Sequence, residues 1–366
     1  LLRAQGMTTR AFLSGASGND LSAFANGFEF FESCAGDMAT ATAAWDSLTQ
    51  HRSEEPERPL FLWLHLSEIA PPLDPGSVVS VVSTRDFRNW FDEERVVPAM
   101  VEGTDLAFGS VEHLDAVTRG ELSLTEPERR RLISLYDGEI SRGIQILRVF
   151  LERYAYARPT VGDGGTQWVM GEQPNEEWSN TLLAVCGVQG TLLGEACDAW
   201  GTAEDLSDAT LNVPLFLHHP NSFTGRRLFD DVVELRDLAP TLLEVFSAKR
   251  PKTMEGRSLL ALTDSYAPRS FEARPAFALL GRERFSLRNS RWRISFDATE
   301  SEETHEIDPL CADLPPLRFY EGTAPLEAER LREDVHPDLR ESLELRLAER
   351  IEREVGLKVS VPALKR

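Results

Sequence analysis

The sequence predicts an α/β protein with a mainly parallel central sheet flanked by helices, followed by a small antiparallel sheet and a terminal helix. Two observations carry this prediction. Short apolar runs bounded by glycine or proline, at residues 59–66 and 182–186, are typical of buried strands of a parallel sheet. Longer segments with apolar residues at helical spacing, at 125–154 and 338–355, indicate helices.

Length and charge limit the range of functions. A chain of 366 residues suits one large α/β domain plus a smaller part, for which we expect limits of 1–265 and 266–366. A net charge of −21 argues against nucleic acid or an anionic membrane surface as the main partner. No stretch approaches the roughly 20 apolar residues of a membrane-spanning helix.

The first half of the chain alternates expected helices and strands. Residues 1–6 have the pattern of a helix end, and a strand is expected at 8–14. Residues 39–51 place Ala41, Ala44, Trp45 and Leu48 on one helix face, and the buried strand 59–66 follows. Thr125 and Glu128 form a capping box that opens a helix through residue 154. The polar, glycine-rich stretch 155–178 is expected to be a surface loop.

The apolar run 182–186 organises the second half. Glycines follow it at positions 187, 190 and 194. Ligands of open α/β sheets bind beyond the carboxyl ends of parallel strands, so chemistry is expected in this loop. Another strand is expected at 211–218, and three short strands at 275–280, 283–289 and 291–297 read as an antiparallel meander. The helix over 338–355 ends at Gly356, which suits a C-cap.

The segment 180–195 resembles the sulfatases of the alkaline phosphatase superfamily. The matching residues are Thr181, Leu182, Val185, Gly190, Gly194 and Glu195. Further matches follow the family's order at 1–6, 27–31, 136–140, 233–246 and 254–260. The resemblance implies an alkaline-phosphatase-like (sulfatase) sandwich with a small C-terminal antiparallel sheet and helix.

The same resemblance implies that the chemistry has been lost, which would leave no catalytic residue. Val188 and Gln189 stand where the family has the Asp and His that bind metal and the ester group. The degenerate family positions are Ala70, Val188, Gln189, Ala196, Thr202 and Arg293. Valine cannot ligate a metal, and one neutral glutamine oxygen is insufficient to hold calcium. No metal and no other cofactor is therefore expected.

The family's first strand, with its paired Asp residues, and its nucleophile motif would lie upstream of Leu1. The chain is therefore expected to be N-terminally incomplete. By family analogy we expect a periplasmic or membrane-associated protein, with a protein partner in a larger complex. Membrane association would come through the missing N-terminal part.

Two functions remain open. The first is a non-catalytic sulfatase-like domain with a structural or binding role. The second is a divergent metal-dependent hydrolase of sulfuric or phosphoric esters, with calcium or another divalent ion held by relocated ligands. Candidate ligands are Asp198, Asp205, Asp208 and His218. Cys186 and Cys197 flank the loop; they form a disulfide in an oxidising compartment or remain separate thiols.

Overall fold

The structure is a computed structural model. It describes residues 1–15, 25–67, 100–162, 165–194, 199–201, 205–223, 226–263, 274–297, 317–321, 330–332 and 334–356. The chain forms two compact units. The first unit comprises Leu1–Val117 and Ser123–Leu182, and the second comprises Thr118–Leu122 and Leu183–Arg366. The domain limits expected at 1–265 and 266–366 stay a prediction.

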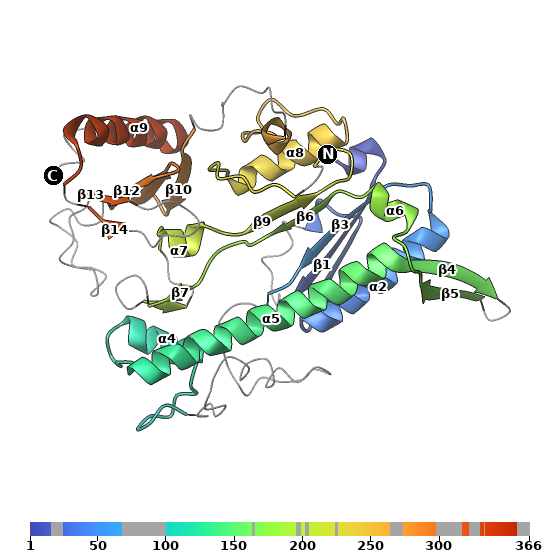
Figure 1. Cartoon of the computed structure of the whole chain (residues 1–366), viewed down its shortest axis with the longest axis horizontal. Helices are drawn as coiled ribbons and strands as arrows, with labels where there is room; N and C mark the ends of the chain where they lie inside the picture. The colour runs from blue at the N-terminus through green and yellow to red at the C-terminus, as the bar shows by residue number, and fades with distance from the viewer. Residues whose placement is uncertain are drawn as a thin grey trace. The chain divides into compact units, whose positions relative to one another are not determined.

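A parallel three-stranded sheet forms the centre of the first unit (Figure 1). Its order is β2 (Phe30–Cys34), β1 (Thr8–Ser14), β3 (Leu60–His65), with β1 paired in parallel to both neighbours. A short 3₁₀ helix, η1 (Arg3–Gln5), precedes β1. The strands predicted at 8–14 and 59–66 and the α/β class are confirmed.

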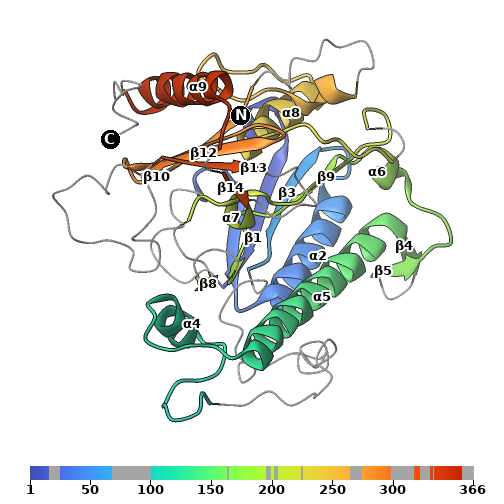
Figure 2. The same ribbon diagram turned by 60° about the vertical axis from the view of Figure 1, so that its left-hand side comes forward.

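Two helices, α2 (Asp37–Glu54) and α5 (Glu126–Tyr156), lie side by side in the first unit (Figure 2). Their apolar side chains share a core with β1, made of Phe12, Ala41, Ala44, Ile146 and Phe150. The helix predicted at 39–51 is confirmed and extends for a few residues at each end. The predicted buried positions Ala41, Ala44 and Leu48 are all buried.

Helix α5 begins at the predicted capping box. The Glu128 carboxylate accepts hydrogen bonds from the Thr125 backbone N–H (2.8 Å) and hydroxyl (2.7 Å). This satisfies one of the backbone N–H groups left unpaired at a helix start. The spacing of apolar residues in this helix predicts a buried face of Leu132, Leu135, Tyr136, Ile140, Ile144, Leu147 and Leu151. This prediction is wrong for Ile144, which is 58% exposed. An ion pair between Glu139 and Arg142 occupies the buried face instead, with 3.2 Å between Oε2 and Nε.

The predicted surface loop at 155–178 contains regular structure. Strands β4 (Ala157–Gly162) and β5 (Gly165–Met170) form an antiparallel hairpin beyond the end of α5, and α6 (Glu176–Ser179) follows (Figure 1). The prediction failed because the side chains of β5 are mostly exposed, so the strand lacks the alternation of a half-buried strand. Helix α4 (Val111–Thr118) was likewise not predicted.

The second unit begins with β6 (Leu183–Cys186). This strand pairs antiparallel with β9 (Leu215–His218), and Ala184 and Cys186 are exposed. The prediction of a fully buried strand of a parallel sheet is therefore wrong for 182–186. A five-residue apolar run cannot specify whether its partner strand is parallel or antiparallel, because the pattern reports only which side chains are buried.

Short elements connect β6 and β9 to the rest of the unit. They are β7 (Leu192–Leu193), β8 (Trp200–Gly201), α7 (Asp208–Leu211), η3 (Leu235–Asp237), α8 (Leu238–Val245) and η4 (Leu259–Leu262). Strands β7 and β8 pair antiparallel. Across the described residues, no helix is long and apolar enough to cross a membrane.

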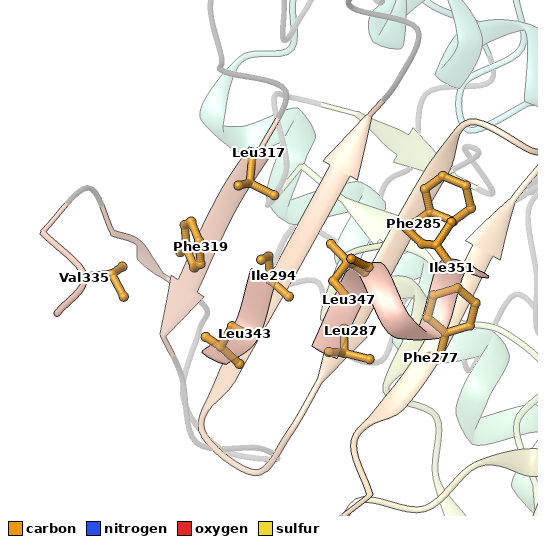
Figure 3. Close-up of a cluster of buried hydrophobic side chains, with 11 residues drawn as sticks. Phe277, Phe285, Leu287, Ile294, Leu317, Phe319, Val335, Leu343, Leu347 and Ile351 are labelled. Carbon is orange, nitrogen blue, oxygen red and sulfur yellow. The ribbon is translucent and has the colours of Figure 1, made fainter. Parts of the chain in front are cut away.

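A five-stranded antiparallel sheet ends the second unit. Its strands, in spatial order, are β10 (Ala276–Leu280), β11 (Arg284–Arg288), β12 (Trp292–Asp297), β13 (Leu317–Glu321) and β14 (Arg330–Leu331). Helix α9 (Pro337–Val355) buries Leu343, Leu347 and Ile351 against this sheet (Figure 3). Gly356 caps the helix at a φ of 75°. The predicted meander and terminal helix are confirmed, whereas β13 and β14 were not predicted.

Candidate functional site

The loop after β6 is held in place by backbone hydrogen bonds. The Gly187 N–H donates to the Pro214 carbonyl (3.0 Å), and the Gly190 N–H donates to the Thr210 carbonyl (2.8 Å). A β-carbon at position 190 would lie 1.8 Å from the Ala209 carbonyl oxygen, so only glycine permits this approach. Residues 187–190 therefore have a defined path against the segment that contains α7.

Val188 and Gln189 occupy the exposed turn of this loop. The Val188 side chain is 64% exposed, and Gln189 is also exposed. Of the two, only Gln189 carries a polar side chain, and its amide offers a single neutral oxygen to a cation. This loop therefore presents no carboxylate or imidazole at the two positions where the sulfatase resemblance places them.

Of the other four degenerate positions, the structure describes only Arg293. Ala70, Ala196 and Thr202 lie outside the described residues. Arg293 lies on β12 and is 4% exposed, with its guanidinium 3.9 Å from the centre of the Tyr320 ring. A cation over an aromatic face at this distance is a stabilising packing contact within the C-terminal sheet.

Two of the alternative ligands already serve the local structure. The Asp205 carboxylate accepts a hydrogen bond from the Ser207 N–H (2.8 Å) just before α7. The Asp208 carboxylate lies 2.9 Å from Nη2 of Arg288, a residue of β11. Metal binding by either carboxylate would compete with these contacts.

His218 lies at the other end of the β6–β9 pair from the loop. The register pairs Leu183 with His218 and Cys186 with Leu215. At roughly 3.3 Å per residue, His218 is on the order of 10 Å along the strand from the start of the loop. His218 and the carboxyl end of β6 are therefore at opposite ends of the pair, because the two strands run antiparallel.

No group of three His, Cys, Asp or Glu side chains that could hold a metal ion occurs among the described residues. Asp198 lies outside them, as does Cys197. Cys186 is a free thiol in the structure. Its pairing with Cys197 and the ligand role of Asp198 stay predictions.

Sequence reasoning missed a polar cluster in the first unit, at the carboxyl ends of β1 and β3. Asp37, the first residue of α2, is fully buried, and its Oδ1 accepts hydrogen bonds from the Ser14 hydroxyl (2.5 Å) and the Ser67 N–H (2.9 Å). The hydroxyls of Ser14 and Ser67 lie 2.8 Å apart. These bonds join two strand ends to a helix start. The available signal was a serine just at or after each strand and an aspartate opening the next helix.

The fold and the site define an α/β protein with a unit built on a parallel sheet. A loop containing three glycines follows β6, and a C-terminal antiparallel sheet packs against a helix. Residues 204–277 match the family model described as N-sulphoglucosamine sulphohydrolase, C-terminal. The chain is also 32% identical over 89 residues to an arylsulfatase of Clostridium perfringens, covering 24% of this chain and 18% of that protein. Both matches are to sulfatases, and each covers only a part of this chain.

The matched part spans less than a fifth of the length of the arylsulfatase. Among solved structures, one of a protein in complex with its substrate D-glucosamine-2-N,6-O-disulfate matches with a TM-score of 0.48 and 12% identity. That match covers 87% of this chain and 74% of the other. The activity of the whole protein is therefore a matter of proposal.

Proposed function

We propose that this chain is a sulfatase-like domain that does not hydrolyse esters and that acts as a structural or binding component of a larger assembly. The observation that carries the proposal is the pair Val188 and Gln189. The backbone of their loop has a defined conformation, because Gly190 packs against a backbone carbonyl. The side chains that the loop exposes are nevertheless an alkyl group and a neutral amide.

Metal-dependent ester hydrolysis has chemical demands that this loop does not meet. A divalent ion must be held by several oxygen ligands before it can polarise the ester or activate a nucleophile. Val188 supplies none, and Gln189 supplies at most one without charge. Among the replacements, Asp208 is ion-paired with Arg288, and His218 is at the far end of the strand pair.

The second candidate is a sulfuric ester hydrolase with relocated ligands. It requires Asp205 and Asp208 to leave their present partners and to be joined by Asp198 or by His218. That rearrangement would break the Asp208–Arg288 ion pair, in which the two side chains are 19% and 10% exposed. Breaking a largely buried ion pair is costly. The geometry favours the non-catalytic role for this reason.

The test measures metal and turnover in the intact protein. After dialysis, elemental mass spectrometry is expected to find no stoichiometric divalent ion, and an aryl sulfate and an aryl phosphate are expected to be hydrolysed at the uncatalysed rate. About one equivalent of calcium, or turnover that falls in the Asp208→Asn variant, would overturn the proposal in favour of the hydrolase.

A loop variant provides the matched comparison. Val188→Asp with Gln189→His restores the side chains that the resemblance places there, on a turn where both are exposed. Because neither side chain is packed, the double variant is expected to unfold at the same temperature as the wild-type protein. A large loss of stability would show that the loop is under a structural constraint that the described contacts do not contain.

A further inference from the structure

An arginine-rich pocket lies in the second unit, apart from the loop after β6. Its volume is about 380 Å³, which is within the usual range for small-molecule sites. It is lined by Arg236, Glu255, Gly256, Arg257, Arg274, Arg350 and Arg353. These residues come from η3, from the segment after α8, from the residues before β10 and from α9, so the fold assembles the pocket from four separate stretches.

The carboxylates around the pocket are each shared among several arginines. Glu234 contacts Arg236 at 2.9 Å and Arg350 at 3.8 Å, and it also pairs with Arg274. Glu354 is likewise shared, at 3.2 Å from Arg350 and 3.1 Å from Arg353. Each arginine carries five N–H donors, so these few oxygens cannot satisfy them all.

Arg350 shows where an acceptor is lacking. The residue is 8% exposed, and its Nε and Nη2 atoms are shielded from solvent without a hydrogen-bond acceptor among the described residues. Burying a charged donor without an acceptor costs free energy, and an anion bound beside this guanidinium would offset the cost of burying its charge. Arg350 is one of the residues that line the pocket.

Like charges lie close together in the pocket. Burial lowers the pKa of the Arg274 guanidinium, and the charge of Arg353 lowers this pKa further, against an opposing contribution from Glu354. Five arginines face four carboxyl groups, those of Glu234, Asp237, Glu255 and Glu354. The local balance is therefore positive in a chain of net charge −21.

We propose that this pocket binds a small molecule through a phosphate or sulfate group. Planar guanidinium groups match such oxyanions with paired N–H donors, and arginine is favoured over lysine at sites of this kind. The volume exceeds what a lone oxyanion needs, so the group is expected to be carried on an organic body of sugar size. The proposal does not depend on the loop after β6, and it holds whether or not that loop is catalytic.

Calorimetric titration of the intact protein tests the proposal. The probes are inorganic phosphate, inorganic sulfate, glucose 6-phosphate and glucose 6-sulfate, at an ionic strength held constant with sodium chloride, and glucose serves as the uncharged control. Saturable binding of at least one oxyanion probe, without binding of glucose, is expected. Tighter binding of the esters than of the free ions would identify an esterified group as the ligand, and the reverse would identify the free ion.

Three variants locate the binding site. Arg353→Gln removes a guanidinium whose side chain is 64% exposed at the pocket, so the protein is expected to fold and to bind the probe roughly tenfold more weakly. Arg350→Gln is expected to weaken binding at least as much, with folding checked by circular dichroism. Arg346→Gln, on the exposed face of α9, is the control and is expected to bind as wild type. Absence of saturable binding by all four probes, or equal affinity in all three variants, would overturn the proposal.

Discussion

The substitution Gly190→Ala tests the geometry of the loop after β6. The added β-carbon would lie 1.8 Å from the Ala209 carbonyl oxygen and 2.9 Å from its carbonyl carbon. Carbon and carbonyl oxygen approach no closer than about 3.3 Å, so the two segments must separate by roughly 1.5 Å. Both contacts are with backbone atoms, which cannot rotate away as a side chain can.

The cost of Gly190→Ala has two sources. Forcing a methyl group into packed structure costs about 1–3 kcal/mol. The separation also breaks the hydrogen bond from the Gly190 N–H to the Thr210 carbonyl, which adds about 1 kcal/mol. The free energy of unfolding of the second unit is therefore expected to fall by about 2–4 kcal/mol.

Urea unfolding gives the free energy, and hydrogen exchange of peptides covering 183–218 shows whether the loss is local. Gly187→Ala is the control, because its β-carbon would meet Val213 Cβ at 3.0 Å and Pro214 Cδ at 3.2 Å, a much smaller overlap than the one at position 190. It is expected to cost clearly less. If Gly190→Ala unfolds within about 0.5 kcal/mol of the wild type, the close approach of the loop to α7 is refuted.

Two further predictions concern the first unit. Arg142→Met removes one side of the buried Glu139–Arg142 ion pair and is expected to lower the free energy of unfolding by about 3–5 kcal/mol. Arg148→Met breaks an exposed pair on the same helix and should leave the urea midpoint unchanged; similar effects of the two variants would contradict this. Burial lowers the pKa of His113, so the unfolded chain takes up its proton first and stability should fall as the pH drops below about 6.5. His113→Gln should flatten that decline, and an unchanged pH profile of unfolding would show that His113 is not its cause.

Local sequence signals predicted those elements whose pattern is contained in a short window of sequence. The strand over 8–14, the capped start of α5 and the terminal helix with Gly356 at its end all appear as predicted. Each rests on interactions between neighbours in the chain or on one apolar stripe that must be buried. Such signals are complete within a short window, so one sequence is sufficient to recognise them.

Pairing between distant segments was predicted less well. The run 182–186 looks the same whether its partner is parallel or antiparallel, and its antiparallel pairing with β9 moved His218 away from the loop. The buried face of α5 was misjudged because Glu139 and Arg142 are charged, and only their mutual contact makes burial acceptable. That two charged residues would occupy the buried face in place of apolar ones cannot be deduced without knowing how their side chains lie in space.

The arginine pocket likewise could not be predicted from the sequence, because its charges come from distant segments. The net charge of −21 argues against a large anionic surface as partner, because an extended polyanion meets the field of the whole protein. A small oxyanion in a pocket meets only the nearest groups, since charges beyond about 8 Å are screened at physiological ionic strength. Arg236, Arg257, Arg274 and Arg350 are scattered over more than a hundred positions of sequence, and each looks like an ordinary surface arginine in an acidic chain. Their charges add only because η3, the segment after α8, the residues before β10 and α9 bring them to one place. A composition that argues against polyanions is therefore compatible with a local anion site.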